Sequence, residues 1–152
     1  GRGVFASADI KAGETIAKFV GESYKSHFAC SLPDKIVDHA VQVGPEEYIS
    51  ADGRLAELVN HSCEPNCGIK NLTEIFAVED IVKGTEISWD YRLTEDSDWE
   101  LNQCDCGSQS CFGRVDGWSS LPHERQQEYL SKNMVSEWIV NKMSVGAERD
   151  NE

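Results

Sequence analysis

Apolar and polar residues alternate in short runs over the first ninety residues, as is typical of β-strands, and one pattern occurs twice. Phe-Ala-x-x-Asp-Ile-x-x-Gly-x-x-Ile begins at Phe5 and again at Phe76, so all six identities fall at one offset of 71 residues. Each copy is patterned as a strand, a turn of Lys-Ala-Gly or Val-Lys-Gly, and a second strand. The repeat therefore predicts two similar β-hairpins, one near each end of this segment.

The stretch between the two copies predicts shorter elements. Residues 36–50 read as two short strands broken at Gly44-Pro45, and residues 54–59 predict one or two helical turns. His39 then lies within a strand over residues 38–43.

From Ser120 onward the spacing of apolar residues changes to that of a helix. Ser120 is suited to cap the helix N-terminus and Pro122 to its first turn. Apolar side chains then recur at four-residue intervals and form one stripe, made of Leu130, Met134 and Trp138 with Val135, Ile139 and Met143. We expect the stripe to pack on the chain's own domain, with a partner-binding helix as the alternative, and residues 146–152 to form a loose tail.

The charge balance narrows the range of partners. The 152 residues include 14 Lys and Arg against 27 Asp and Glu, a net charge of −13. Because phosphates need cationic partners, we expect no direct binding of nucleic acid; a basic partner fits better, and plain solubility is the other explanation of the acidity. No apolar run approaches the roughly 20 residues of a membrane span, and no secretory signal is visible. The chain lacks an initiator methionine, which indicates a fragment or a processed chain.

Six cysteines predict either disulfides or a metal site. In a small secreted chain they would suggest disulfides, but Cys104, Cys106 and Cys111 fall within eight residues. Thiolates at such spacing can share one ion, and a tetrahedral structural zinc needs four nitrogen or sulfur ligands. Cys63 and Cys67 are the candidates for the fourth. We therefore expect structural zinc in a reducing compartment, with free reduced cysteines as the alternative.

Two dense stretches carry candidate chemistry. In NHSCEPNC, residues 60–67, the neighbours His61 and Cys63 suggest a Cys–His nucleophile pair, but only weakly, because such pairs are normally assembled from distant positions. In GTEISWDY, residues 84–91, Trp89 and Tyr91 are two residues apart on a strand and so share one face. Two core aromatics are the simpler interpretation of that pair.

Four blocks together resemble a SET-domain protein-lysine N-methyltransferase with a post-SET zinc motif, in the order of that family. They are GRGVFA at 1–6, NHSCEPNC at 60–67, GTEISWDY at 84–91 and CDCGSQSC at 104–111. The resemblance implies a mainly β, β-clip-like fold with short helices, in which small curved sheets surround a pseudoknot-like crossing. It divides the chain into a SET domain over 1–91, an acidic connector with a post-SET zinc-binding segment over 92–116, and a C-terminal helical extension and tail over 117–152.

The resemblance also implies roles for individual residues. S-adenosylmethionine would be the cofactor, and Tyr91 the catalytic residue that, with Trp89, lines the substrate channel. The residues implied to bind the cofactor are Arg2, Gly3, His39, Asn60, His61, Tyr91, Asp105 and Phe112, the last two closing over the adenine. The implied zinc ligands are Cys63, Cys104, Cys106 and Cys111, which leaves Cys30 and Cys67 as buried thiols.

Three positions depart from the usual pattern of the family. His39 stands where many relatives have Tyr, so a plain strand histidine is the alternative to a cofactor contact. Glu57 stands where many have Arg, which puts a structural ion pair in doubt. Trp89 stands where relatives have Phe or Tyr, at a position linked to the number of methyl groups added, so mono-, di- and trimethylation stay open.

The leading hypothesis is therefore a lysine methyltransferase acting on a Lys-rich protein segment, with a histone tail as the default substrate class. An inactive, zinc-stabilised SET-like module that binds a peptide or partner is the second hypothesis, and a Cys–His hydrolase is the third. We expect the nucleus if the source is eukaryotic, and the cytoplasm or delivery to a host if it is bacterial.

Overall fold

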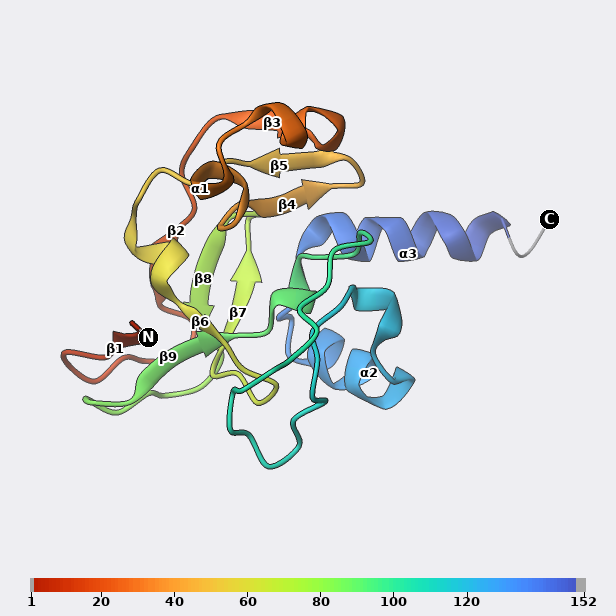
Figure 1. Ribbon diagram of the computed structural model, residues 1–152. Coiled ribbons are helices and arrows are strands. Elements are labelled where there is room, and N and C mark those ends of the chain that lie inside the picture. The colour runs from red at the N-terminus through yellow and green to blue at the C-terminus, as the bar shows by residue number, and fades with distance from the viewer. Residues whose placement is uncertain (1, 150–152) are drawn as a thin grey trace.

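The computed structural model describes residues 2–149 and is mainly β, with its two longer helices, α2 and α3, at the C-terminal end (Figure 1). The strands are β1 Val4–Phe5, β2 Thr15–Lys18, β3 Ser23–Lys25, β4 Val41–Gly44, β5 Glu47–Ile49, β6 Asn60–His61, β7 Cys67–Lys70, β8 Glu74–Ala77 and β9 Glu86–Trp89. The α-helices are α1 Asp34–Val37, α2 His123–Ser131 and α3 Glu137–Arg149, and single 3₁₀ turns cover Ser26–Ser31, Leu55–Leu58, Tyr91–Leu93 and Trp118–Ser120. No helix among the described residues is long and apolar enough to cross a membrane.

Two sheets position everything else. The larger sheet has the strand order β1-β9-β7-β8-β2, with β6 paired to β9, and the smaller has the order β3-β5-β4. In Figure 1 the small sheet lies above the large one, and α2 and α3 lie to one side of both. Strand β9 runs parallel to both β6 and β7, so the segment that joins these two strands lies against β9 at both of its ends.

The prediction of two hairpins is wrong, because the two copies of the repeat pair with each other. Strand β1 pairs with β9 and β2 pairs with β8, all antiparallel. At the centre, Ile10 and Ile81 exchange two backbone hydrogen bonds, each of 2.8 Å. Both copies carry the same alternation of apolar residues, so strand pattern alone cannot tell pairing within a copy from pairing between copies.

The cross-pairing has a local two-fold symmetry that explains the repeated aspartates. The Asp9 carboxylate accepts from the Lys83 backbone N–H at 2.8 Å, and Asp80 accepts from the Ala12 backbone N–H at 2.9 Å. Each aspartate therefore caps the turn of the other copy. This use of a short polar side chain to satisfy a turn amide is typical of Asp.

The structure of residues 36–59 agrees in part with the elements predicted from the sequence. The two strands broken at Gly44-Pro45 and the helical turn within 54–59 are confirmed, as β4, β5 and a 3₁₀ turn. The expected strand over residues 38–43 is wrong at its start, since β4 begins at Val41 and His39 lies exposed in a turn. Pro33 opens the short helix α1, and its last turn closes through a bond from the Asp38 N–H to the Asp34 carbonyl at 2.8 Å.

The C-terminal segment forms two helices instead of one, and Pro122, not Ser120, is the N-cap of the first. Asn133 interrupts the helical run with a φ of 52°, a left-handed conformation that Asn tolerates. The connection then docks on β7, where the Ile69 N–H donates to the Met134 carbonyl at 2.9 Å. Gly68 permits this approach, because a Cβ there would lie 2.8 Å from the Cα of Met134.

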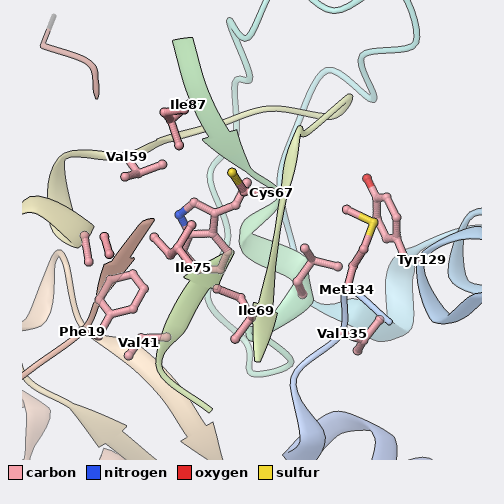
Figure 2. Close-up of a cluster of buried hydrophobic side chains, with 14 of the residues drawn as sticks. Phe19, Val41, Val59, Cys67, Ile69, Ile75, Ile87, Tyr129, Met134 and Val135 are labelled. Atoms are coloured by element: carbon pink, nitrogen blue, oxygen red, sulfur yellow. The ribbon is translucent and has the colours of Figure 1, made fainter. Parts of the chain in front are cut away.

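The core is continuous from the sheets to the helices (Figure 2). Ile75 and Ile87 of the larger sheet, with Phe19 directly after β2, belong to the same cluster as Tyr129 and Met134 of the C-terminal segment. Cys67 is fully buried, as expected. Cys30 is exposed, which corrects the expectation of a buried thiol; the 3₁₀ turn that carries it contributes no buried residue.

Because the extension is part of this core, Ile139→Ala on α3 should destabilise the whole domain. Its side chain is fully buried, and large-to-small changes at such sites cost about 2–5 kcal/mol. Val140→Ala, at a neighbouring position that is 38% exposed, should change the free energy of unfolding by no more than about 0.5 kcal/mol. Urea denaturation of both variants checks the prediction, and equal effects would show that α3 does not pack as described.

Candidate active site and metal centre

A pocket of about 200 Å³ opens between the small sheet and the segment that follows β9. Its aromatic lining consists of Phe19, Tyr24, Tyr48, Trp89, Tyr91 and Trp99. Three acidic residues, Asp38, Glu57 and Glu95, also line it. An apolar wall with a few carboxylates suits a long alkyl side chain that ends in a cationic or amine group.

Tyr91 is held in this pocket from two sides. It follows β9 directly, and its hydroxyl donates to the Val59 carbonyl at 3.3 Å while its backbone N–H donates to Nδ1 of His61 at 3.2 Å. Burial raises the pKa of the Tyr91 hydroxyl. The group is therefore protonated near neutral pH and can orient a reactant by hydrogen bonding, but it is not a base.

Trp89 forms the neighbouring part of the wall. Its ring lies 5.0 Å from that of Tyr91 and 5.7 Å from that of Phe19, measured between centroids. The side chain is 5% exposed, and its indole Nε1 has no hydrogen-bond partner among residues 2–149. The strand alternation that predicted a shared face for Trp89 and Tyr91 matches their common place in the pocket.

Glu95 is the most buried acid of the pocket. Its carboxylate accepts from the Tyr48 hydroxyl at 3.3 Å and from both the backbone N–H and the hydroxyl of Ser97. The pKa of Glu95 is raised, chiefly because burial disfavours the charged form. Glu57 forms no ion pair within residues 2–149; its carboxylate accepts from the backbone N–H of Gly53 at 2.9 Å, as the cap of a surface turn.

The N-terminal glycine motif meets β6 and β9 at one junction. The Asn60 side-chain amide donates to the Arg2 carbonyl at 2.9 Å and to the Glu86 carboxylate at 3.0 Å. A Cβ on Gly3 would lie 2.6 Å from that carboxylate, so only glycine fits without displacing it. Gly3 is partly exposed next to Asn60 and has no side chain, so a ligand could approach its backbone closely.

The cysteines gather at the other end of β6. Ligand atoms of His61, Cys63, Cys104 and Cys106 all lie within 4.8 Å of one another, and this cluster could hold a metal ion. The Cys63 and Cys104 sulfurs are 4.0 Å apart, close to the roughly 3.8 Å expected between thiolates on one tetrahedral zinc with Zn–S of about 2.3 Å. The Cys111 thiol lies 3.7 Å from the Cys104 carbonyl, at the edge of this group.

His61 links the cysteine cluster to the segment that carries Tyr91. Its Nδ1 accepts from the Tyr91 N–H, so the ring proton of the neutral imidazole is on Nε2, 3.3 Å from the Cys63 sulfur. Burial lowers the pKa of His61 to about 4, which keeps the ring neutral. A protonated Nε2 donates to sulfur and cannot bind a metal at the same time, so this geometry fits a supporting contact to Cys63 better than ligation.

A buried ion pair of Asp90 and Arg92 joins the cysteine cluster to the segment that carries Tyr91. The Asp90 carboxylate is fully buried and receives two side-chain bonds of 2.9 Å from Arg92, which also donates to the Cys63 sulfur at 3.4 Å. The Asp90 carboxylate also accepts from the Tyr129 hydroxyl at 2.9 Å. Sequence reasoning missed Arg92 and Tyr129, because neither belongs to a recognisable spacing and their partners come from other elements.

The remaining predicted residues lie apart. Asp105 is exposed and accepts from the Gln103 side chain at 2.9 Å. Phe112 is 37% exposed, and the Arg92 guanidinium lies over its ring at 4.6 Å. His39 lines the aromatic pocket, whereas the other implied cofactor residues except Tyr91 do not.

Comparison with known proteins places these features in one family. The SET-domain family model matches residues 1–92. The chain belongs to the SET-domain family. It is 33% identical over 130 residues to the histone-lysine N-methyltransferase trithorax of Drosophila virilis, covering 73% of this chain and 3% of that protein. It is 31% identical to the histone-lysine N-methyltransferase ATX2 of Arabidopsis thaliana, covering 91% of this chain and 14% of that protein.

Solved structures agree on the fold of this SET domain. KRYPTONITE, in complex with methylated CHG DNA and S-adenosylhomocysteine (SAH), matches with a TM-score of 0.56 at 24% identity, over 74% of this chain and 26% of that one. A second KRYPTONITE complex, which also contains an H3(1–15) peptide, matches with a TM-score of 0.55. The SET fold predicted from the four sequence blocks is therefore confirmed. The zinc motif and the individual site residues stay predictions.

If the cysteine cluster is a zinc site, purified protein should contain one zinc per chain. Cys63→Ser, Cys104→Ser and Cys106→Ser should each lose it, because three ligands do not close a structural site. Cys30→Ser, on the exposed surface, and Cys67→Ser, in the core, should retain it. Elemental analysis of the purified variants is the measurement, and zinc content that does not respond to the first three changes would rule out this site.

Proposed function

We propose that this SET domain transfers a methyl group from S-adenosylmethionine to a lysine side chain of a basic protein segment, with a histone tail as the default substrate. One observation carries the proposal: Tyr91 and Trp89 lie together in an aromatic pocket whose wall holds three carboxylates. The names of the relatives point the same way, since both relatives compared above are histone-lysine N-methyltransferases.

The pocket suits the chemistry of a lysine nucleophile. A free lysine has a pKa near 10.4, so it arrives as an ammonium ion and must lose a proton before its nitrogen can attack. The acidic residues at the pocket attract the cation, and the aromatic wall disfavours the charged form once the side chain is desolvated. Bound S-adenosylmethionine supplies an electrophilic methyl group, and the Tyr91 hydroxyl is placed to orient the amine for in-line attack.

We place the cofactor at the junction of residues 2–3 with Asn60 and His61. The accessible backbone at Gly3 and the Asn60 amide support this position, and Tyr91 joins it to the pocket through His61. Asp105 and Phe112, on the cysteine loop, would close over the adenine. His39 is the weakest member of the predicted set, because it lies in the pocket wall away from this junction.

We further propose that zinc is bound by Cys63, Cys104, Cys106 and Cys111, with His61 and Arg92 donating to the Cys63 sulfur. Such N–H donors stabilise a thiolate ligand. The metal then has a structural role, since it orders a loop that buries little apolar surface of its own.

The partner and compartment follow from the same proposal. A Lys-rich segment complements the net charge of −13. We infer a nuclear location if the source is eukaryotic. One neighbour was solved with DNA, so the acidity of this domain does not exclude nucleic acid as a partner of the protein that contains it.

Tyr91→Phe should lower the rate of methyl transfer to core histones by about 100-fold, because one oriented hydroxyl at the reacting atoms is lost. Transfer of a labelled methyl group from S-adenosylmethionine measures the rate. Calorimetric titration with the cofactor is the control, since the variant should bind it as the wild type does. A variant that keeps full activity would remove Tyr91 from the mechanism, and wild-type protein that binds no cofactor would favour an inactive binding module.

The acidic surface and pocket should also steer the substrate. With a Lys-rich peptide, kcat/KM should fall by at least about threefold between roughly 0.05 M and 0.5 M salt, because screening shortens the range of the attraction. A peptide with the same target lysine, but with glutamine at its other basic positions, should show little salt dependence. Equal salt dependence for the two peptides would contradict electrostatic recognition.

A further inference from the structure

The cysteine loop, residues 102–114, is weakly anchored by its own side chains. Within this range only Cys104 is buried, and two glycines with left-handed φ, Gly107 at 72° and Gly113 at 77°, form its turns. In Figure 1 the loop projects from the body of the molecule below α2. A loop of this kind depends on specific polar contacts, or a metal, for a fixed position.

Arg125 of α2 supplies several of those contacts at once. Its Nη1 donates to the Cys63 carbonyl at 2.8 Å, and its Nη2 donates to the Ser110 hydroxyl at 3.2 Å. The guanidinium also lies over the rings of Phe112 and Tyr129, at 5.5 Å and 5.6 Å from their centroids. One side chain thus contacts both ends of the cysteine cluster and the aromatic residue that follows it.

Helix α2, which carries Arg125, also contacts the residue before Tyr91. One turn after Arg125, the Tyr129 hydroxyl donates to the Asp90 carboxylate at 2.9 Å and lies 3.4 Å from the Cys63 carbonyl. Asp90 immediately precedes Tyr91. Helix α2 therefore contacts the segment before Tyr91 and the cysteine loop simultaneously.

General packing of α2 does not account for this arrangement. The apolar stripe and Tyr129 already fix the extension to the core. Arg125 brings a second guanidinium, beside that of Arg92, to the ring of Phe112, and two cations near one ring repel each other. The buried carboxylate of Asp90 and the partly exposed one of Glu128 offset this repulsion.

We propose that Arg125 is a positioning residue that latches the cysteine loop onto the SET core, so that the C-terminal extension sets how long zinc and cofactor stay bound. The latch itself depends only on the described contacts. Its effect on cofactor binding rests on the proposed methyltransferase function.

Three variants on α2 and the loop test the latch. Arg125→Ala removes all the contacts, whereas Arg125→Lys keeps the charge but lacks the planar fork that serves two acceptors and stacks on a ring. Ser110→Ala removes one acceptor of Arg125 together with the bond from the Ser110 hydroxyl to Glu64, and it keeps the test possible if Arg125→Ala does not fold. Gln127→Ala is the matched control, since Gln127 is exposed on the same helix and its side chain forms no hydrogen bond within residues 2–149.

Amide hydrogen exchange over residues 102–114 is the primary readout, because it needs neither metal nor cofactor. Exchange should be about 10-fold faster in Arg125→Ala, intermediate in Arg125→Lys and Ser110→Ala, and unchanged in Gln127→Ala. Zinc release to a chromophoric chelator should accelerate in the same order, again by about 10-fold for the alanine variant, as is typical when a supporting contact of a metal site is lost.

Cofactor titration and steady-state kinetics complete the experiment. Arg125→Ala should weaken S-adenosylmethionine binding and raise its KM by about 10-fold with a much smaller change in kcat, because the loop still closes but opens more often. Wild-type exchange and zinc release in Arg125→Ala would overturn the latch. If the wild type binds no cofactor, the proposed function fails while the exchange and zinc measurements still decide on the latch.

Discussion

The buried Asp90 carboxylate is the constraint on which the rest of the site depends. A charge with no exposed surface persists only when it is paired and fully hydrogen-bonded, and here Arg92 and Tyr129 supply the donors. Removing one partner from such a pair typically costs about 3–5 kcal/mol. The three elements that meet at Asp90 are therefore fixed relative to one another: the turn that carries Tyr91, the cysteine cluster through Arg92, and helix α2.

This constraint explains why local motifs suffice to identify the family but not to describe the site. The sequence blocks at 60–67 and 84–91 contain Asn60, His61, Cys63, Trp89 and Tyr91, all of which the structure uses. Each is recognisable because it lies within a short stretch of unusual composition. Arg92, Arg125 and Tyr129 are ordinary residues whose roles arise from contacts across 29 to 66 positions of sequence, and no periodicity carries that information.

The fold shows the same division between local and long-range information. Alternation predicted most of the strands, the break at Gly44-Pro45 and the burial of the C-terminal stripe. Alternation did not predict which strands pair in the repeat. The same pattern fits pairing within each copy and pairing between the two copies, and the structure has the second. Alternation failed again at Asn133, because the apolar spacing from Leu130 to Met143 continues across the break and only the docking of Met134 on β7 reveals it.

The C-terminal extension and the proposed zinc would order the cysteine loop in different ways. A loop that closes over a cofactor must be ordered while the reaction proceeds and must release when the product leaves, so one irreversible anchor would be a disadvantage. In the proposed zinc site the metal would tie the loop to Cys63 at its base, whereas Arg125 holds the loop by a hydrogen bond to Ser110 and by stacking on Phe112, contacts that can break and re-form. The bonds from the Arg125 guanidinium to a backbone carbonyl and a serine hydroxyl are assisted by the charge of the donor, but they lack the charged acceptor of an ion pair. Contacts of this kind make Arg125 suited to control an opening step, while the proposed zinc would keep the loop folded throughout.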